Sequence, residues 1–197
     1  MRLYDESKSQ ESGIPDGSFY AEDLALAHEQ RRLRHASHVI TTEEMVWEES
    51  PHGLLKHVAN PKLNPHVHDI DAYIQELPPD GRSGKHQHMA EEFIFFLEGR
   101  GYSLHWDVDL VEMGETFHWG ISDTPQRFDW EATDWMYIPV NTVHQHFNLD
   151  GDAPARFLSA TSRLYKFLGT HDLRQIEPAP PLGDYRPSLT GRDVPHA

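Results

Sequence analysis

The sequence predicts an all-β domain, a sandwich or barrel built from short antiparallel strands. From residue 54 onward, short apolar runs alternate with turn residues, which is typical of strands joined by hairpins. Fourteen prolines and thirteen glycines are spread along the 197 residues, and they suit a chain with many turns. The sequence shows no internal repeat, so we expect a single domain.

Eight segments have the length and composition of strands, and they are separated by turn residues such as 78–81, 98–101 and 150–152. The predicted strands are 54–59, 71–77, 92–97, 101–106, 107–112, 134–138, 143–149 and 155–161.

The two ends of the chain differ from this central part. Residues 19–37 contain no Pro or Gly and place acidic residues before arginines, which predicts a helix. Residues 163–169 are expected to form one short helical turn, and the segment from Glu177 holds five prolines. We therefore expect an N-terminal arm and helix over 1–40, a barrel over 41–170 and an extended Pro-rich tail over 171–197.

Composition narrows the classes of partner and of chemistry. The formal charge of −15 repels phosphate backbones and anionic lipid, which argues against nucleic acid or membrane as the main partner. The chain has no cysteine, so any metal must be held by nitrogen and oxygen ligands. The N-terminus lacks the apolar core of a signal peptide and no run has membrane-spanning length, so we expect a cytoplasmic protein.

Segment 81–99 carries the first group of candidate ligands. His86 and His88 are two residues apart, so they project from the same face of a strand. Glu92 opens the next apolar run and shares its inward face with Ile94 and Phe96. A charge at the start of an inward row is costly unless something neutralises it, and a metal ion does so.

A second segment, 139–148, supplies another imidazole. Pro139 ends a strand, Asn141 can adopt the left-handed turn conformation, and His144 enters the following strand. Open positions around such a set of imidazoles and a carboxylate suit Fe(II), Mn(II), Co(II) or Ni(II) better than a closed structural zinc site. The predicted ligands of one divalent metal are His86, His88, Glu92 and His144.

These two segments resemble the two signature motifs of the cupin superfamily. The first motif runs Gly, five residues, His-x-His, three or four residues, Glu, six residues, Gly; only Gly81 departs from it, by one residue. The second runs Gly, five residues, Pro-x-Gly, two residues, His, three residues, Asn; here Asn141 replaces the second glycine and the first glycine is absent. The residues that match are His86, His88, Glu92, Gly99, Pro139, His144 and Asn148.

The resemblance implies a jelly-roll barrel, the double-stranded β-helix of the cupins, with the metal inside. It leaves the reaction open, because dioxygenases, decarboxylases, isomerases, sugar-binding regulators and storage proteins share this fold. The His-Gln-His-Phe-Asn ending of the second motif looks like that of gentisate- and salicylate-type ring-cleaving dioxygenases. Those enzymes usually have two cupin domains and lack the glutamate of the first motif, whereas this short chain retains Glu92.

We therefore expect a metal-dependent cupin enzyme, a mononuclear Fe(II) dioxygenase acting on a small aromatic or diketone-like substrate. Mn(II), Ni(II), Co(II) and Zn(II) remain open as the metal. His146 shares strand parity with His144, so it is the candidate catalytic group that handles protons, or else a hydrogen-bonded barrel histidine. The alternatives are a non-redox isomerase, lyase or decarboxylase, and a non-catalytic cupin that binds a small ligand. Spare length at both termini predicts a homodimer.

Other polar residues have open roles. His66 and His68 have the two-residue spacing but no Glu or closing Gly at the required distance. Arg100 and Arg127 are candidate cations for a substrate carboxylate. Two His-Trp pairs lie between the motifs, where they could form a lid over the barrel mouth or belong to a surface hairpin. These pairs are His105-Trp106 and His118-Trp119.

Overall fold

The computed structural model describes residues 21–23, 25–26, 39–63, 67–187 and 192–193 of the chain. It divides into two units, Met1–His38 and Val39–Ala197. In the first unit the described residues are helical, within the predicted helix over 19–37; the rest of that prediction lies outside the described residues. The strands belong to the second unit.

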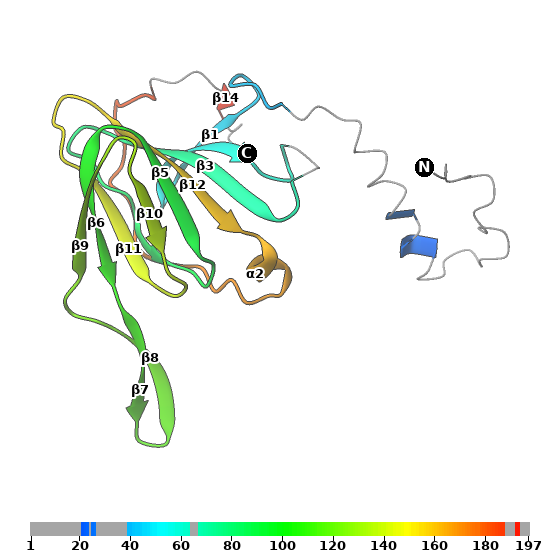
Figure 1. Ribbon diagram of the computed structural model, residues 1–197, viewed down its shortest axis with the longest axis vertical. Coiled ribbons are helices and arrows are strands. Elements are labelled where there is room, and N and C mark those ends of the chain that lie inside the picture. Colours follow the sequence, from blue (N-terminus) through cyan, green and yellow to red (C-terminus); the bar gives the residue numbers. More distant parts are fainter. Residues whose placement is uncertain (1–20, 24, 27–38, 64–66, 188–191, 194–197) are drawn as a thin grey trace. The chain divides into compact units, whose positions relative to one another are not determined.

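The larger of two main sheets has seven strands in the order β10-β5-β12-β3-β2-β1-β14 (Figure 1). Its neighbours are antiparallel except β1 and β14, which pair in parallel. The strand bounds are β1 Val46–Ser50, β2 Gly53–Ala59, β3 Ile70–Leu77, β5 Glu92–Glu98, β10 Trp135–Ile138, β12 Ala155–Ser162 and β14 Arg192–Asp193.

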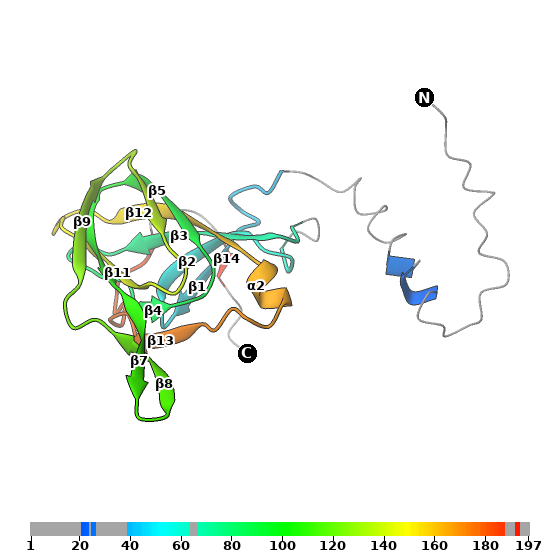
Figure 2. The same cartoon turned by 60° about the horizontal axis from the view of Figure 1, so that its bottom comes forward.

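The second sheet has five strands in the order β13-β4-β11-β6-β9, and it curves with the first around a common interior (Figure 2). A two-stranded sheet, β7 with β8, and a short helix, α2, complete the fold. The bounds are β4 Lys85–Gln87, β6 Arg100–Trp106, β7 Val108–Met113, β8 Thr116–Ile121, β9 Gln126–Glu131, β11 Val143–Asn148, β13 Arg174–Glu177 and α2 Leu164–Phe167.

The predicted all-β jelly roll is confirmed, and each of the eight predicted strands overlaps an observed one. The helical turn predicted over 163–169 is also present, as α2. The prediction lacked β1, β4, β8, β9, β13 and β14. Two of these strands lack an apolar pattern that the sequence could reveal, because β4 has only three residues and β13 is exposed along its length. Both are strands because they pair with each other in the sheet. The boundaries at residues 40 and 170 stay a prediction.

Buried and exposed side chains alternate along β5, so that one face contributes to the core and includes a charged residue. Glu92, Ile94 and Phe96 are buried, whereas Phe93 is half-exposed. The ring of Phe96 stacks on Trp130 with 4.1 Å between centroids. The inward row that the sequence predicted is therefore confirmed, and its first member is a carboxylate.

Two turn residues hold the strands that carry the predicted ligands. Asn141, before β11, has φ 64°, the left-handed conformation that the sequence predicted for it. Gly99, between β5 and β6, has φ +85°, and a Cβ there would lie 2.7 Å from the Cβ of Ala155. Glycine is therefore required where β5 turns into β6.

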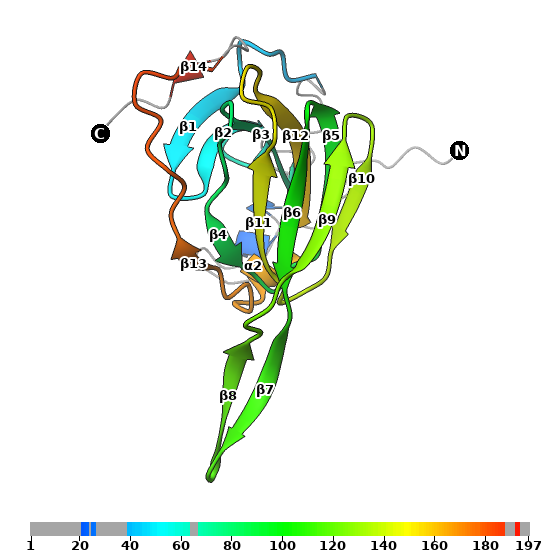
Figure 3. The ribbon, with the colours of Figure 1, turned by 90° about the vertical axis from the view of Figure 1, so that its left-hand side faces the viewer.

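The β7–β8 hairpin extends away from the barrel (Figure 3). Its strands pair only with each other among the described strands. His118 and Trp119 lie exposed on β8, so for this pair the surface-hairpin interpretation holds and the lid interpretation is wrong. Among the described residues, no helix has the length and apolar character needed to cross a membrane.

Candidate metal centre

Three strands bring the predicted ligands together. His86 lies on β4, His88 directly follows that strand, Glu92 begins β5, and His144 lies on β11. The antiparallel register of β4 and β11 pairs His86 with His144, which places their side chains beside each other. The two sequence segments therefore meet because two strands of the smaller sheet are neighbours.

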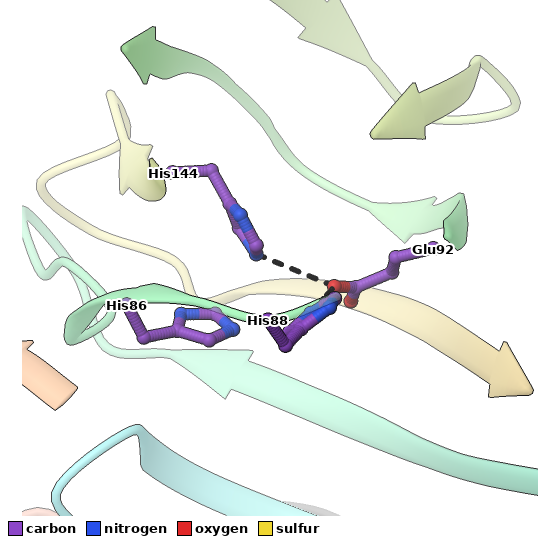
Figure 4. Close-up of side chains that lie close together, drawn as sticks. All are labelled: His86, His88, Glu92 and His144. Carbon is purple, nitrogen blue, oxygen red and sulfur yellow. Dashed lines mark hydrogen bonds and ion pairs between the residues drawn. The ribbon is translucent and has the colours of Figure 1, made fainter. Parts of the chain in front are cut away.

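The four side chains point toward one another inside the barrel (Figure 4). One ligand atom from each lies within 4.8 Å of the others, and all four residues are buried. The Nε2 atoms of His88 and His144 lie 3.0 and 3.3 Å from Oε2 of Glu92. The ring centroids of His86 and His144 are 4.1 Å apart.

Backbone carbonyls orient two of these imidazoles. Nδ1 of His88 lies 2.8 Å from the carbonyl oxygen of Ala90, and Nδ1 of His144 lies 2.9 Å from that of Thr142. A carbonyl can only accept a hydrogen bond, so both Nδ1 atoms carry the proton in the neutral ring. The lone pair of each Nε2 is then left for the centre of the cluster, as metal coordination requires.

Electrostatics in the cluster keep the carboxylate ionised. Burial raises the pKa of Glu92, but the imidazoles of His144 and His88 beside its carboxylate outweigh this effect and hold the pKa well below its usual range. Tyr73 and Ser159 also donate hydroxyl hydrogen bonds to Oε1 of Glu92. Burial lowers the pKa of His86 well below its usual value, so this imidazole is neutral.

The donor set fits a divalent metal ion. Nε2 of His144 and Nδ1 of His86 are buried and have no hydrogen-bond partner among the described residues. Buried polar atoms without partners are rare in folded proteins, and a bound ion is one way to satisfy them. Neutral imidazoles and an ionised carboxylate are ordinary ligands of first-row divalent metals.

A cavity of about 440 Å³ opens onto one side of this cluster, at His86 and His88. Its wall includes apolar side chains such as Leu55 and Leu173, and it includes His52 and Tyr73. Nε2 of His52 lies 3.2 Å from the hydroxyl of Tyr73. A small molecule in this cavity would therefore contact both apolar walls and polar groups next to the cluster.

A profile of the family described as "Auxin binding protein" matches residues 32–166, which is more than half of the chain. The chain belongs to this cupin family. Two members from Nicotiana tabacum, auxin-binding proteins T85 and T92, are each 27% identical over 95 residues, which is 48% of this chain and 46% of each relative. The match therefore spans about half the length of these relatives.

Solved structures of oxalate decarboxylase are also similar to this member of the auxin-binding protein family. The Bacillus subtilis enzyme at pH 4.6 has a TM-score of 0.47 at 17% identity, covering 65% of this chain and 28% of that chain. The formate complex of the Lactobacillus farciminis enzyme has a TM-score of 0.46 at 20% identity, covering 69% of this chain and 33% of that chain.

His52 and Tyr73 are residues that sequence reasoning missed in this cupin. His52 lies in the turn between β1 and β2, and Tyr73 lies on β3, where neither has a motif neighbour. Burial lowers the pKa of His52 to about 4. His171, which precedes β13, was also missed, and its ring stacks on His88 at 5.7 Å between centroids. Only their positions in the folded chain connect these side chains with the cluster.

His146 lies on β11 and points inward, as predicted from its parity with His144. Its Nδ1 is 2.7 Å from the hydroxyl oxygen of Ser103, which also accepts a hydrogen bond from Nε1 of Trp130 at 3.1 Å. Its Nε2 is buried with no hydrogen-bond partner among the described residues. The ring lies 5.6 Å from that of His144, measured between centroids.

Two arginines and His68 lie away from the cluster. Arg127 is exposed on β9, where it pairs with Asp129 at 2.6 Å, and it lines neither the 440 Å³ cavity nor the 400 Å³ groove between β9 and β10. Arg100 is also exposed and lines neither of them. The prediction that one of these cations faces a substrate carboxylate thus has no geometric support. His68 is exposed, and His66 lies outside the described residues.

The first His-Trp pair is part of the barrel, unlike the second. His105 and Trp106 are buried at the end of β6. The ammonium group of Lys85 lies 3.9 Å from the centroid of the Trp106 ring, a cation–π contact. Trp106 therefore has a packing role, and His105 faces the groove between β9 and β10.

Proposed function

We propose that this chain is a metal-dependent enzyme acting on a small organic substrate, and that it is a mononuclear Fe(II) dioxygenase. The observation that carries the proposal is the cavity of about 440 Å³ that opens onto His86 and His88. Its wall combines apolar surface with His52 and Tyr73, so a bound molecule would meet hydrogen-bonding groups beside the metal ligands. A pocket with a few convergent polar groups is typical of an active site.

The metal would be held by His86, His88, Glu92 and His144. When bound, it would supply Lewis acidity and, for a redox-active ion such as Fe(II), electron transfer. Fe(II) is our first choice for an open centre of nitrogen and oxygen ligands, and Mn(II), Co(II), Ni(II) and Zn(II) fit the same donors. The cluster carries one negative charge, since its imidazoles are neutral when they bind metal.

The chain's own residues would orient the substrate and move protons. Leu55 and Leu173 form apolar walls that exclude water from a bound ring or alkyl group. The hydroxyl of Tyr73 and the imidazole of His52 would hydrogen-bond the polar end of the substrate, since both line the cavity. His146 is our candidate for the proton-handling group on the interior side of the cluster, where Ser103 orients its ring.

A second candidate function is ligand binding without turnover. It is supported by membership of a family whose curated relatives are named auxin-binding proteins. In this case the metal and the cavity would hold a small organic molecule, and the histidines around it would contribute only hydrogen bonds. A non-redox reaction that uses the metal as a Lewis acid is the third candidate.

Oxygen uptake separates these functions. Protein loaded with Fe(II), Mn(II) or Zn(II) would be mixed with catechols, gentisate, salicylates and diketones, with substrate loss followed by chromatography. We expect oxygen consumption with the Fe(II) protein and at least one of these compounds. Product formation with Mn(II) or Zn(II) and no oxygen uptake would replace the dioxygenase with a Lewis-acid enzyme. Calorimetric binding of a compound that is never turned over would favour the binding protein.

Variants test the ligand set itself. His86→Ala removes one donor, and Glu92→Gln replaces the charged carboxylate with a weakly coordinating neutral amide. We therefore expect both variants to lose stoichiometric metal binding, as measured by elemental analysis after gel filtration. His68→Ala is the matched control, because this exposed histidine lies outside the cluster. Loss of metal in the control with retention in His86→Ala would overturn the assignment.

We also propose a homodimer, for which light scattering of the metal-loaded protein should give twice the mass of one chain.

A further inference from the structure

A second cavity lies between the free edges of the two main sheets. This groove has a volume of about 400 Å³ and is lined mainly by residues of β9 and β10. Each of these strands ends its sheet, β9 the five-stranded and β10 the seven-stranded one. The groove shares no lining residue with the cavity that contains His52. It is therefore a separate place at which a molecule could bind.

One of the residues that line the groove, His105, has a buried nitrogen without a hydrogen-bond partner among the described residues. His105 is 6% exposed, and this nitrogen is its Nε2. Its ring lies 4.8 Å from the ring of Phe128, measured between centroids, and both residues line the groove. Since buried polar atoms are nearly always satisfied, an unpartnered nitrogen on a residue that lines a cavity indicates a polar ligand.

The charge of the groove decides which ligands it can take. The carboxylates of Asp107, Asp129 and Asp134 line it, whereas its described lining residues include no lysine or arginine. Asp129 is neutralised by Arg127. The other two accept hydrogen bonds from uncharged groups, Asp107 from the side chain of Gln126 and Asp134 from a backbone N–H. Two carboxylate charges therefore remain to attract a cation and repel an anion.

Apolar side chains form the rest of the wall. Phe128 and Met136 are partly exposed, and Trp130 is buried against the core. An aromatic ring attracts a cation through its quadrupole and an apolar group through desolvation. The wall therefore suits a ligand with both an apolar body and a positive charge.

We propose that the groove between β9 and β10 binds a small organic cation, an aryl- or alkylammonium ion. Its charged group lies near Asp107 and Asp134, and its apolar body covers Phe128. The site is independent of the metal centre, because it needs none of the four metal ligands.

Calorimetry with two probes of similar size and opposite charge tests this assignment. Benzylammonium, which has N–H donors for the unpartnered Nε2 of His105, should bind the metal-loaded protein, whereas benzoate should show at least tenfold weaker binding to the groove. Asp107→Asn and Asp134→Asn keep the hydrogen-bond acceptor but remove the charge, so each should weaken binding of the cation roughly threefold to tenfold. Phe128→Leu should weaken it by a similar factor. Asp109→Asn and Phe117→Leu are matched controls on the β7–β8 hairpin and should leave the affinity unchanged.

Amide chemical shifts locate the probe without relying on variants. Titration with benzylammonium should shift the resonances of Phe128, Met136 and Thr142 and leave those of β7 and β8 unchanged. The same shifts should appear in Glu92→Gln, which separates this site from the metal centre. Benzoate that shifts the resonances of Phe128 and Met136 as strongly as the cation does, equal affinity for the cation in the groove variants and wild type, or no binding of the cation at millimolar concentration would each overturn the proposal.

Discussion

The imidazole of His52 stands edge-on against that of His86, with 4.0 Å between ring centroids and an interplanar angle of 71°. His86 belongs to the metal cluster, whereas His52 comes from the turn between β1 and β2, in the other sheet. This contact restricts the orientation of the His86 ring from the side of the cavity. His52 is therefore not a candidate metal ligand itself, but it helps to orient the candidate ligand His86.

Removing this support should weaken metal binding. We expect His52→Ala to raise the Kd for the metal about tenfold, as is usual when a group that orients a ligand is lost. His57→Ala is the matched control, because His57 lines the same cavity but pairs with Glu48 at 2.6 Å. Competition with a chromogenic chelator at pH 7.5 measures both Kd values. An unchanged Kd in His52→Ala would show that β4 alone orients His86.

Metal removal should destabilise the barrel. An ion bound to the native state alone, at a thousand times its Kd, adds about 4 kcal/mol to the free energy of unfolding. For a chain of this size the corresponding change in Tm is roughly 10 °C. Calorimetry before and after dialysis against EDTA measures the change. His86→Ala should show almost none, and an equal drop in that variant would place the stabilising ion elsewhere.

Acid should destabilise the protein through His105. Burial lowers the pKa of His105 to about 4, below its ordinary value of 6.5. The unfolded chain takes up this proton at 6.5, while the native state excludes it until about pH 4. The stability is therefore complete above pH 6.5 and falls as the pH drops from 6.5 to 4, by about 1 kcal/mol per pH unit.

Urea unfolding at pH 7.5, 6 and 5 measures this dependence. We expect His105→Gln to lose less stability between these pH values than wild type does. His118→Gln, a change at an exposed histidine of β8, should keep the wild-type slope. A slope in His105→Gln as steep as that of wild type would show that other histidines carry the whole effect.

Truncating a side chain should cost much more stability on the inward face of β5 than on its outward face. Phe96 is fully buried and packs between Trp130 and Phe157, so Phe96→Ala should lower the free energy of unfolding by about 3–5 kcal/mol. Phe93 is 52% exposed, so Phe93→Ala should cost less than about 1 kcal/mol. Chemical denaturation gives both values. Equal costs would mean that a partner surface covers the outer face of β5 in solution.

Much of the barrel could be predicted from local pattern. Alternation of Glu92, Ile94 and Phe96 with exposed neighbours is a property of the strand itself, so it predicts which face is inward without knowledge of the fold. Strands such as β4 and β13 were missed for the opposite reason. They are short or polar, and their backbone hydrogen bonds come from partners distant in the sequence.

The set of candidate ligands could be chosen from the sequence itself, because residue type and spacing decide that His86 and His88 share a face and that Glu92 begins an inward row. Only the tertiary structure decided which other side chains lie around these candidate ligands. The register of β4 on β11 places His86 against His144, and the packing of the two sheets brings His52 and Tyr73 of one sheet beside His86 of the other. No local rule links a turn residue to a strand of another sheet, since such contacts form only when the apolar faces of both sheets close on a common core.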